Sequence, residues 1–380
     1  MKKIAIVTKH MKMGGIPKVL ISMLEQIKDD YEIDLYLMDE EGDLLYKIPK
    51  KVNIKNLYVE KRVIDRLKKI YKTQGVVKTL EILFYYIIMK YLKINNEKIL
   101  VKIIPKIDKE YDILISYSFL YSVAVQCALE KINAKEKILW IHSQASIFKN
   151  TSYKEKVKRY QKYFSKFDKI FCVSKDVKND FDKTYMNLSL KTRVFYNLVN
   201  IEEIKKLSLE KNIFFSKEIN ILTVGRLSKE KGQKRIIEVV EKLKKYKFVW
   251  YLIGDGEIKY ELEELIKRKK LENKIKILGQ ILNPYPYIKA SDIYVQPSLS
   301  EGYCTTILEA KILQKPIIAT EFSGIYEQIK NNETGLVVEN SVEGLVKGIE
   351  ELLLNKQKMK IFSNNLVKEI EKEKNKTIEF

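Results

Sequence analysis

The sequence alternates short apolar runs with stretches of helical periodicity, and this series begins twice along the chain. The first series starts at Lys3–Thr8, a β-prone run followed by a loop with Gly14 and Gly15 and then by apolar residues at helical spacing. The second starts at Ile219–Val224, which is followed by a polar loop and a predicted helix over Gln233–Lys245. Strands separated by helices in this rhythm predict an α/β fold whose parallel sheets carry helices on both faces.

The remaining apolar runs fit the same pattern. Further strands are predicted at Ile33–Met38, Ile113–Ser116, Ile138–His142, Ile170–Ser174, Arg193–Asn197, Val249–Ile253, Ile275–Leu278, Ile293–Gln296, Pro316–Ala319 and Gly335–Val338. The stretch Ile113–Leu129 carries no charge, and its 17 residues reach the lower limit for a membrane-spanning helix. Its serines, tyrosines and Gln126 favour a buried strand followed by a helix instead.

A polar, charged stretch at Val199–Lys217 separates the two series, and 380 residues suit two domains. We therefore expect two doubly wound domains, an N-terminal one over residues 1–200 and a C-terminal one over residues 201–355. The Lys/Glu-rich tail over residues 356–380 is predicted to be helical.

The chain carries 71 Lys+Arg against 50 Asp+Glu, a formal charge of +21, which favours a polyanionic partner such as nucleic acid, an anionic membrane or a phosphorylated ligand. Residues 1–200 hold 39 of the basic and 23 of the acidic side chains. The densest basic segment, Lys61–Lys93, also contains the apolar run Ile82–Met89. This combination suits an interfacial helix at a membrane, but a solvated helix docked through its apolar side and a nucleic-acid contact remain open.

Cysteine and histidine are scarce. Cys127, Cys172 and Cys304 form no C-x-x-C pair, and His10 and His142 are the only histidines, so a disulfide framework and a zinc site are disfavoured. The first residues show charges but neither a long apolar core nor a small-residue cleavage pattern, so we expect no signal peptide. A reducing cytosol is the expected location.

A loop that opens a helix follows the strand ending at Val224. It places Arg226 and Lys231 five residues apart, between Gly225 and Gly232. A guanidinium and an ammonium at a helix start suit a diphosphate, and the flanking glycines let the backbone turn closely. A lysine-rich surface loop without a ligand is the alternative.

The strand ending near Gln296 is followed by a segment with two glutamates. Glu301 and Glu309 are eight residues apart, about 80° offset on a continuous helix, so they need not share one face. If Gly302 breaks the backbone, Glu301 lies in a loop and Glu309 in the following helix, and both can converge on a hydroxylated ligand such as a nucleotide sugar. The amides of Cys304, Thr305 and Thr306 would then point from the helix start toward a phosphate. A surface glutamate and a capping glutamate are the alternative.

The order of these motifs resembles the retaining glycosyltransferases of family 4 (glycosyl transferases group 1), of the bacterial surface-polysaccharide type. In the second half the likeness rests on GRLSKEKG, Gly254-Asp-Gly256, EGYCTTILEA, KPIIAT and Thr334-Gly-Leu-Val-Val. In the first half it is looser, in the Gly14-Gly15 loop, Trp140-Ile-His142, Cys172-Val-Ser174 and Tyr196-Asn197-Leu-Val-Asn200. The resemblance implies the GT-B fold, an α/β architecture of two doubly wound Rossmann-like domains facing a central cleft.

The resemblance also implies roles for individual donor-side residues. Arg226 and Lys231 match the pair that neutralises the donor diphosphate, the group toward which the Thr305 and Thr306 amides are expected to point. Glu309 matches the glutamate that accepts hydrogen bonds from the ribose, and Glu301 the one that holds donor-sugar hydroxyls.

Two further positions carry expected roles near the reacting centre. Gly15 matches the glycine whose backbone lies close to the donor phosphate, and His142 the acceptor-side histidine that faces the transferred sugar, although a core histidine remains the alternative. Many family members have Glu after the Gly-Gly-x of the first loop, whereas Pro17 stands here, so any side-chain role at that position is lost.

These implications describe a metal-independent reaction. Cations and helix-start amides stabilise the leaving diphosphate, so no metal or further cofactor is required, and we read Asp180-Phe-Asp182 as a solvated face. The family generally retains configuration by front-face displacement, so no protein nucleophile is expected, and Cys304 is interpreted as filler.

We therefore expect a cytoplasmic enzyme that uses a nucleoside-diphosphate sugar, with UDP as the expected nucleotide of the donor. The expected acceptor is a glycan or a polyprenyl-diphosphate-linked saccharide, with attachment to the inner face of an anionic membrane as an open possibility and without a nucleic-acid partner. A nucleotide-sugar epimerase of the same architecture and a basic nucleic-acid-binding protein are the alternatives.

Overall fold

Two compact units make up the chain. The computed structural model describes residues 1–39, 42–57, 67, 71, 75–84, 87, 101, 104, 106–117, 122–148, 160–210, 216–373 and 380. The first unit comprises Met1–Met13, Leu24–Cys172 and Lys178–Phe195, and the second comprises Gly14–Met23, Val173–Val177 and Tyr196–Phe380. Most of the basic segment Lys61–Lys93 lies outside the described residues.

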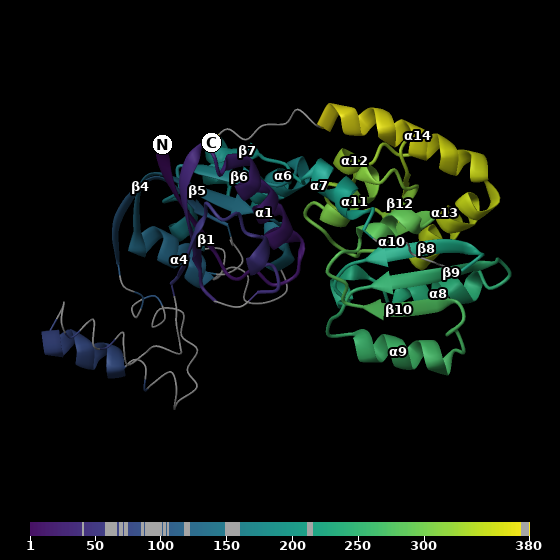
Figure 1. The fold of residues 1–380 in the computed structure, drawn as a ribbon, viewed down its shortest axis with the longest axis horizontal. Helices are drawn as coiled ribbons and strands as arrows, with labels where there is room; N and C mark the ends of the chain where they lie inside the picture. The colour runs from purple at the N-terminus through teal and green to yellow at the C-terminus, as the bar shows by residue number, and fades with distance from the viewer. Residues whose placement is uncertain are drawn as a thin grey trace. The chain divides into compact units, whose positions relative to one another are not determined.

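The first unit is built on a seven-stranded sheet with the order β3-β2-β1-β4-β5-β6-β7 (Figure 1). Its strands, all paired in parallel, are β1 Lys2–Thr8, β2 Tyr31–Leu37, β3 Asn53–Asn56, β4 Ile107–Ser116, β5 Ile132–Ile141, β6 Lys169–Cys172 and β7 Thr192–Val194. Its helices are α1 Gly15–Ile27, α4 Ser122–Lys131 and α6 Lys175–Thr184. The first residues of α1 and of α6 belong to the second unit. The strand order reverses between β1 and β4, which is the place where doubly wound sheets bind ligands.

The uncharged stretch Ile113–Leu129 folds as predicted, because its first residues end the buried strand β4 and its last residues lie in α4. Helix α4 packs on the sheet through Val123, Ala124 and Cys127, which are buried. Within the described part of the chain, no helix is long and apolar enough to cross a membrane.

The prediction that Asp180 and Asp182 form a solvated face is wrong. The Asp180 carboxylate accepts a hydrogen bond from the Ser146 backbone N–H at 2.9 Å. The Asp182 carboxylate accepts from the Thr192 hydroxyl at 2.8 Å and pairs with the Lys178 ammonium at 2.5 Å. Both aspartates thus tie α6 to neighbouring loops and strands of the first unit.

The second unit contains a six-stranded sheet with the order β10-β9-β8-β11-β12-β13, again paired in parallel throughout (Figure 1). Its strands are β8 Ile219–Val224, β9 Phe248–Ile253, β10 Ile275–Gly279, β11 Ile293–Gln296, β12 Ile317–Thr320 and β13 Leu336–Val338. Its helices are α7 Ile201–Leu207, α8 Arg235–Lys242, α9 Lys259–Arg268, α10 Tyr285–Ala290, α11 Thr305–Ile312, α12 Ile325–Gln328, α13 Val342–Leu354 and α14 Lys356–Glu373. The order reverses between β8 and β11.

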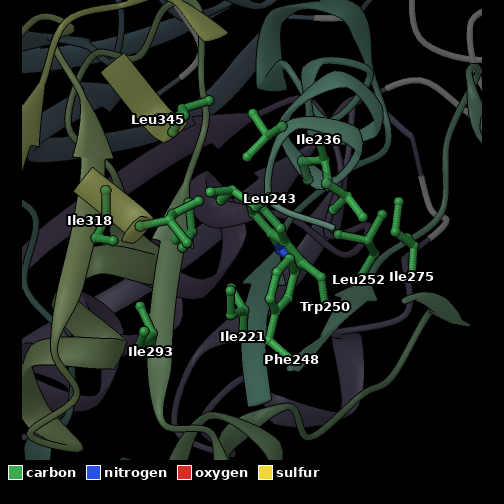
Figure 2. Close-up of a cluster of buried hydrophobic side chains, with 14 of the residues drawn as sticks. Ile221, Ile236, Leu243, Phe248, Trp250, Leu252, Ile275, Ile293, Ile318 and Leu345 are labelled. Carbon is green, nitrogen blue, oxygen red and sulfur yellow. The ribbon is translucent and has the colours of Figure 1, made fainter. Parts of the chain in front are cut away.

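Alternate side chains of these strands enter two separate hydrophobic clusters, one on each face of the sheet. Ile221 contributes to a cluster with α8, α13 and the aromatic rings of Phe248 and Trp250 (Figure 2). The next residue, Leu222, contributes to the other cluster, which includes Ile307 of α11. Helices therefore cover both faces, as the sequence predicts, and the carboxyl ends of β8 and β11 lie side by side.

Candidate active site

Two loops leave the carboxyl ends of the neighbouring strands β8 and β11. The β8 loop (residues 225–232) ends in a short 3-10 turn, Lys229–Lys231, and the β11 loop (residues 297–304) leads into α11. The Leu299 backbone N–H donates to the Glu230 carbonyl at 2.8 Å, so the two loops are joined by their backbones. This is the edge at which the sequence predicts ligand binding.

Gly232 makes this close approach possible. It adopts φ 70°, a left-handed conformation that favours glycine, and a Cβ atom there would lie 2.0 Å from the Pro297 carbonyl oxygen. No larger residue fits without moving the backbone of one loop. The glycine therefore fixes the distance between the β8 loop and the β11 loop.

Lys231 and Glu301 meet across these loops. The Lys231 ammonium lies 2.6 Å from Glu301 Oε1 and 2.8 Å from Oε2, with the two side chains 22% and 10% exposed. Burial lowers the pKa of Lys231, but the charge and hydrogen bond of Glu301 together with the charges of neighbouring groups outweigh that effect, so the pKa is raised from its ordinary value. Lys231 is therefore a cation at physiological pH.

Arg226 is placed differently from its predicted partner Lys231. Its side chain is 68% exposed, and its guanidinium pairs at 2.6 Å with Oε1 of Glu230, which lies four residues further along the same loop. Lys231 and Arg226 thus contact different carboxylates, and the Arg226 side chain is the more exposed of the two.

A buried amide supports Glu301, and sequence reasoning missed it. Gln296, the last residue of β11, donates to Ser298 Oγ at 2.8 Å and to Glu301 Oε1 at 3.4 Å. Its Oε1 accepts from Tyr294 OH at 2.9 Å and from Thr306 Oγ1 at 3.2 Å. The Ser298 hydroxyl also donates to Glu301 Oε1 at 2.7 Å. Gln296 therefore links the loop carboxylate to the first turn of α11.

The start of α11 differs in one respect from the expectation. The backbone N–H of Cys304 donates to Gln328 Oε1 at 2.9 Å, and Gln328 Nε2 donates to the Cys304 carbonyl at 2.8 Å. The prediction that the Cys304 amide points to a phosphate is therefore wrong, because a buried side-chain amide already occupies it. Thr305 and Thr306 follow as the first residues of the helix, and both are half-buried.

Gly15 lies against this helix start within the second unit. A Cβ atom on Gly15 would come 2.9 Å from Thr305 Oγ1 and 3.5 Å from its methyl group. Because Gly15 has no side chain, the backbone of the first turn of α1 can lie close to Thr305.

Glu309 is a buried carboxylate in the middle of α11, with its side chain 2% exposed. Its Oε1 accepts from the Lys18 ammonium at 2.9 Å and from Tyr285 OH at 3.3 Å. Its Oε2 is buried and accepts no hydrogen bond from the residues that the structure describes. Sequence reasoning missed Lys18 and Tyr285, which are distant from Glu309 in the chain and belong to no motif.

His142 belongs to the first unit, where it follows β5 directly. Its Nε2 donates to the Tyr117 carbonyl at 3.1 Å, and its ring lies edge-on to the Tyr117 ring with centroids 4.5 Å apart. Burial lowers the pKa of His142 to about 3, although the bond to the carbonyl opposes the shift, so the imidazole is neutral at physiological pH. A neutral ring with a fixed Nε2–H can bind a polar ligand but carries no charge.

Comparison with known proteins agrees with this geometry. Residues 204–369 match the family described as glycosyl transferases group 1. An uncharacterized glycosyltransferase of Methanocaldococcus jannaschii is 32% identical over 201 residues, which cover 50% of this chain and 49% of that protein. The alignment thus spans about half the length of that relative.

Other relatives align over most of their length. The N-acetylgalactosamine-N,N'-diacetylbacillosaminyl-diphospho-undecaprenol 4-alpha-N-acetylgalactosaminyltransferase of Campylobacter jejuni is 24% identical over 369 residues, covering 96% of this chain and 93% of that protein. An O-antigen biosynthesis glycosyltransferase of Escherichia coli is 23% identical over 337 residues, covering 86% and 83%.

A solved structure supports the fold. The chain superposes on HepE of Anabaena, determined in complex with UDP-glucose, with a TM-score of 0.71 at 18% identity, covering 98% of this chain and 95% of that one. Each of the two sheets is parallel, and the strand order of each reverses once. This architecture agrees with the group 1 match and with these relatives. Residues 204–369 therefore form a glycosyl transferases group 1 domain, and the chain as a whole has the GT-B fold.

Proposed function

We propose that the protein is a glycosyltransferase that moves a sugar from a UDP-linked donor, with retention of configuration, to a glycan or polyprenyl-diphosphate-linked acceptor in cell-surface polysaccharide synthesis. The donor is bound by the C-terminal domain, residues 201–355, and the acceptor by the N-terminal domain, residues 1–200. Residues 356–380 are a C-terminal tail outside both roles, and its helix is α14, Lys356–Glu373. The HepE structure with UDP-glucose and the match to group 1 support a nucleotide-sugar donor.

The observation that carries the proposal is the unsatisfied carboxylate oxygen of Glu309. A buried carboxylate oxygen without a hydrogen bond is costly, since its desolvation is not compensated. An ionised carboxylate only accepts, so the missing partner must be a donor group. The hydroxyls of a ribose are such donors, and Glu309 lies on α11, the helix into which the β11 loop leads.

The neighbouring charges suit the diphosphate and the sugar. An ammonium has three N–H groups, of which Glu301 occupies two, so Lys231 keeps one for a phosphate oxygen. Arg226 adds an exposed guanidinium, and the backbone amides of Thr305 and Thr306 add the positive end of α11. Glu301, held rigidly by Ser298, presents its carboxylate to donor-sugar hydroxyls. These groups stabilise the charge that develops on the leaving diphosphate.

Two residues act close to the reacting centre in this proposal. Gly15 lets the backbone at the start of α1 approach the donor phosphate without steric conflict. His142, neutral and fixed by Tyr117, contacts the transferred sugar as a hydrogen-bonding group rather than as a general acid.

The acceptor side rests on charge and on one relative. The Campylobacter jejuni protein is named for a diphospho-undecaprenol substrate, and 39 of the 71 basic side chains here lie in residues 1–200. We propose that the enzyme works in the cytoplasm at the inner face of an anionic membrane, where lipid-linked acceptors are exposed. Nucleic acid is not a partner in this account.

The test is the release of UDP from UDP-sugars by the purified protein. Lys231→Ala should lower the rate by about 100-fold, because a cation that stabilises the leaving group is lost. Glu309→Ala should also lower the rate sharply, because the hydrogen bonds to the ribose are lost. Lys242→Ala and Glu343→Ala are matched controls, because these side chains form an exposed ion pair in the same unit. Equal rates in all five proteins would refute the assignment of the site.

A further inference from the structure

We propose that Lys18 is a ribose-recognition residue of the donor site, one that makes the enzyme select ribonucleotides over deoxyribonucleotides. It does so by holding Glu309 Oε1, so that Oε2 stays available to the ribose hydroxyls. The inference rests on the proposed function, because it deepens the role assigned there to Glu309.

The position of Lys18 follows from the first turn of α1. Its backbone N–H donates to the Gly14 carbonyl at 3.3 Å, which places the side chain one turn into the helix, after Pro17. From there the ammonium reaches Glu309 Oε1 at 2.9 Å. It also lies over the ring of Tyr285, 5.2 Å from the centroid, where cation–π attraction adds to its placement.

Burial makes this ion pair important for the placement of Glu309. The Glu309 side chain is 2% exposed and the Lys18 side chain 21%, so Lys18 is the partner nearer to solvent. A buried carboxylate is costly unless a cation or several hydrogen-bond donors compensate its charge. Lys18 supplies that cation, while the Tyr285 hydroxyl donates to the same oxygen at 3.3 Å.

The arrangement is one-sided, and this asymmetry identifies the ligand chemistry. Both contacts fall on Oε1, whereas Oε2 is buried and accepts nothing from the described residues. A ligand that satisfies Oε2 must donate a hydrogen bond, and it must lie beside an ammonium with N–H groups to spare. Adjacent hydroxyls meet both demands, since one donates to Oε2 while the oxygen of the other accepts from Lys18. A nucleoside diphosphate carries such a pair in its ribose, and a deoxynucleotide lacks it.

The experiment is a calorimetric titration of UDP, 2′-deoxy-UDP and 3′-deoxy-UDP into the full-length protein. The wild type should bind UDP about tenfold or more tightly than either deoxy analogue, as a hydrogen bond to a charged group implies. Lys18→Met should weaken UDP binding by about tenfold and bring the preference for UDP close to one. Lys18→Arg should restore part of the preference, because it keeps the charge.

Controls separate recognition from loss of structure. Lys28→Met removes a lysine that pairs with Glu25 just beyond α1, and it should bind like the wild type. The ratio of affinities within one variant does not depend on the folded fraction, so a poorly folded Lys18→Met remains informative. In a double variant with Glu309→Gln, the Lys18 effect on the ratio should vanish, because both residues act through one carboxylate.

An unchanged preference for UDP in Lys18→Met, or tighter UDP binding by that variant, would overturn the proposal. Either result would leave the proposed function intact, since the wild type would still bind UDP. If the wild type itself binds no UDP, the proposed function fails and the role of Lys18 fails with it.

Discussion

Replacing Lys231 by methionine tests whether the Lys231–Glu301 pair combines a structural and a chemical role. The substitution leaves Glu301, 10% exposed, with Ser298 and Gln296 as its donors among the residues that the structure describes. Breaking a fully buried ion pair costs roughly 3–5 kcal/mol and an exposed one contributes roughly 0.2–1 kcal/mol. At the intermediate burial seen here we expect a loss of about 2 kcal/mol in the free energy of unfolding.

That loss has a measurable size. One kcal/mol lowers the melting temperature of a domain of 150–250 residues by about 2–4 °C, so Lys231→Met should melt about 4–8 °C below the wild type. The rate of UDP release should fall by about 100-fold, because one cation at the leaving group is gone. The double variant Lys231→Met/Glu301→Gln removes both charges, so it should recover most of the melting temperature but none of the activity.

The pH dependence of the pair gives a second check. The pKa of Lys231 is raised in the folded protein, so its contribution to stability is complete below the pKa of an unfolded lysine and is lost only as pH rises through the folded value. The difference in melting temperature between wild type and Lys231→Met should therefore be constant at neutral pH and shrink at strongly alkaline pH. A double variant no more stable than the single one, or a single variant with full activity, would refute the reasoning.

Three other substitutions test separate parts of the structure. Gln296→Met removes an amide with four hydrogen-bonding partners, so it should cost about 1–3 kcal/mol in urea unfolding and slow UDP release; a neutral effect would show that the network does not position Glu301. The pKa of His142 is lowered to about 3, so the folded protein leaves it unprotonated while the unfolded chain takes up a proton near pH 6.5. The wild type should therefore lose about 2 kcal/mol in the free energy of unfolding between pH 8 and pH 5, and His142→Gln should not. Equal pH profiles of the two proteins would contradict this. Gly232→Ala should destabilise far more than Gly279→Ala in thermal melts, because both have left-handed backbone but only the former places a Cβ atom against a carbonyl, at 2.0 Å; equal losses would contradict the contact.

Much of the fold could be predicted because buried parallel strands are apolar along their whole length. Ile219–Val224 and Ile293–Gln296 match the predicted strands to the residue. The strand β4 begins at Ile107, well before the predicted Ile113. The prediction is too short because the amino-terminal part of the strand is charged and is held by partners elsewhere in the chain. There Lys109 pairs with the buried Asp34 of β2 at 2.8 Å, a contact that no local pattern reveals.

The edge strand β3, Asn53–Asn56, was missed for a related reason. It is four residues long and mostly polar, and it pairs with β2 on one side only. A strand that buries little apolar surface leaves no periodic signal in the sequence.

The candidate site shows the same limit at the level of side chains. Glu301 in a loop and Glu309 in the next helix follow from the break at Gly302, as predicted. Which carboxylate each cation contacts could not be predicted from the sequence, because Lys231 pairs with Glu301 in the other loop whereas Arg226 pairs with Glu230 in its own loop. Such choices depend on three-dimensional distances between segments far apart in the chain.

Gln328 and Lys18 illustrate this most clearly. Gln328 occupies the Cys304 amide that we expected to face a phosphate, and Lys18 pairs with Glu309 from a point 291 residues away. Neither side chain carries a sequence signal, because glutamine and lysine are common in helices of every function.

A crystal structure of the protein with UDP would show whether Glu309 and Lys231 bind the nucleotide. We expect a ribose hydroxyl within hydrogen-bonding distance of Glu309 Oε2 and a phosphate oxygen within reach of the Lys231 ammonium. UDP bound away from these two side chains, or bound here with Glu309 Oε2 still unpartnered, would contradict it.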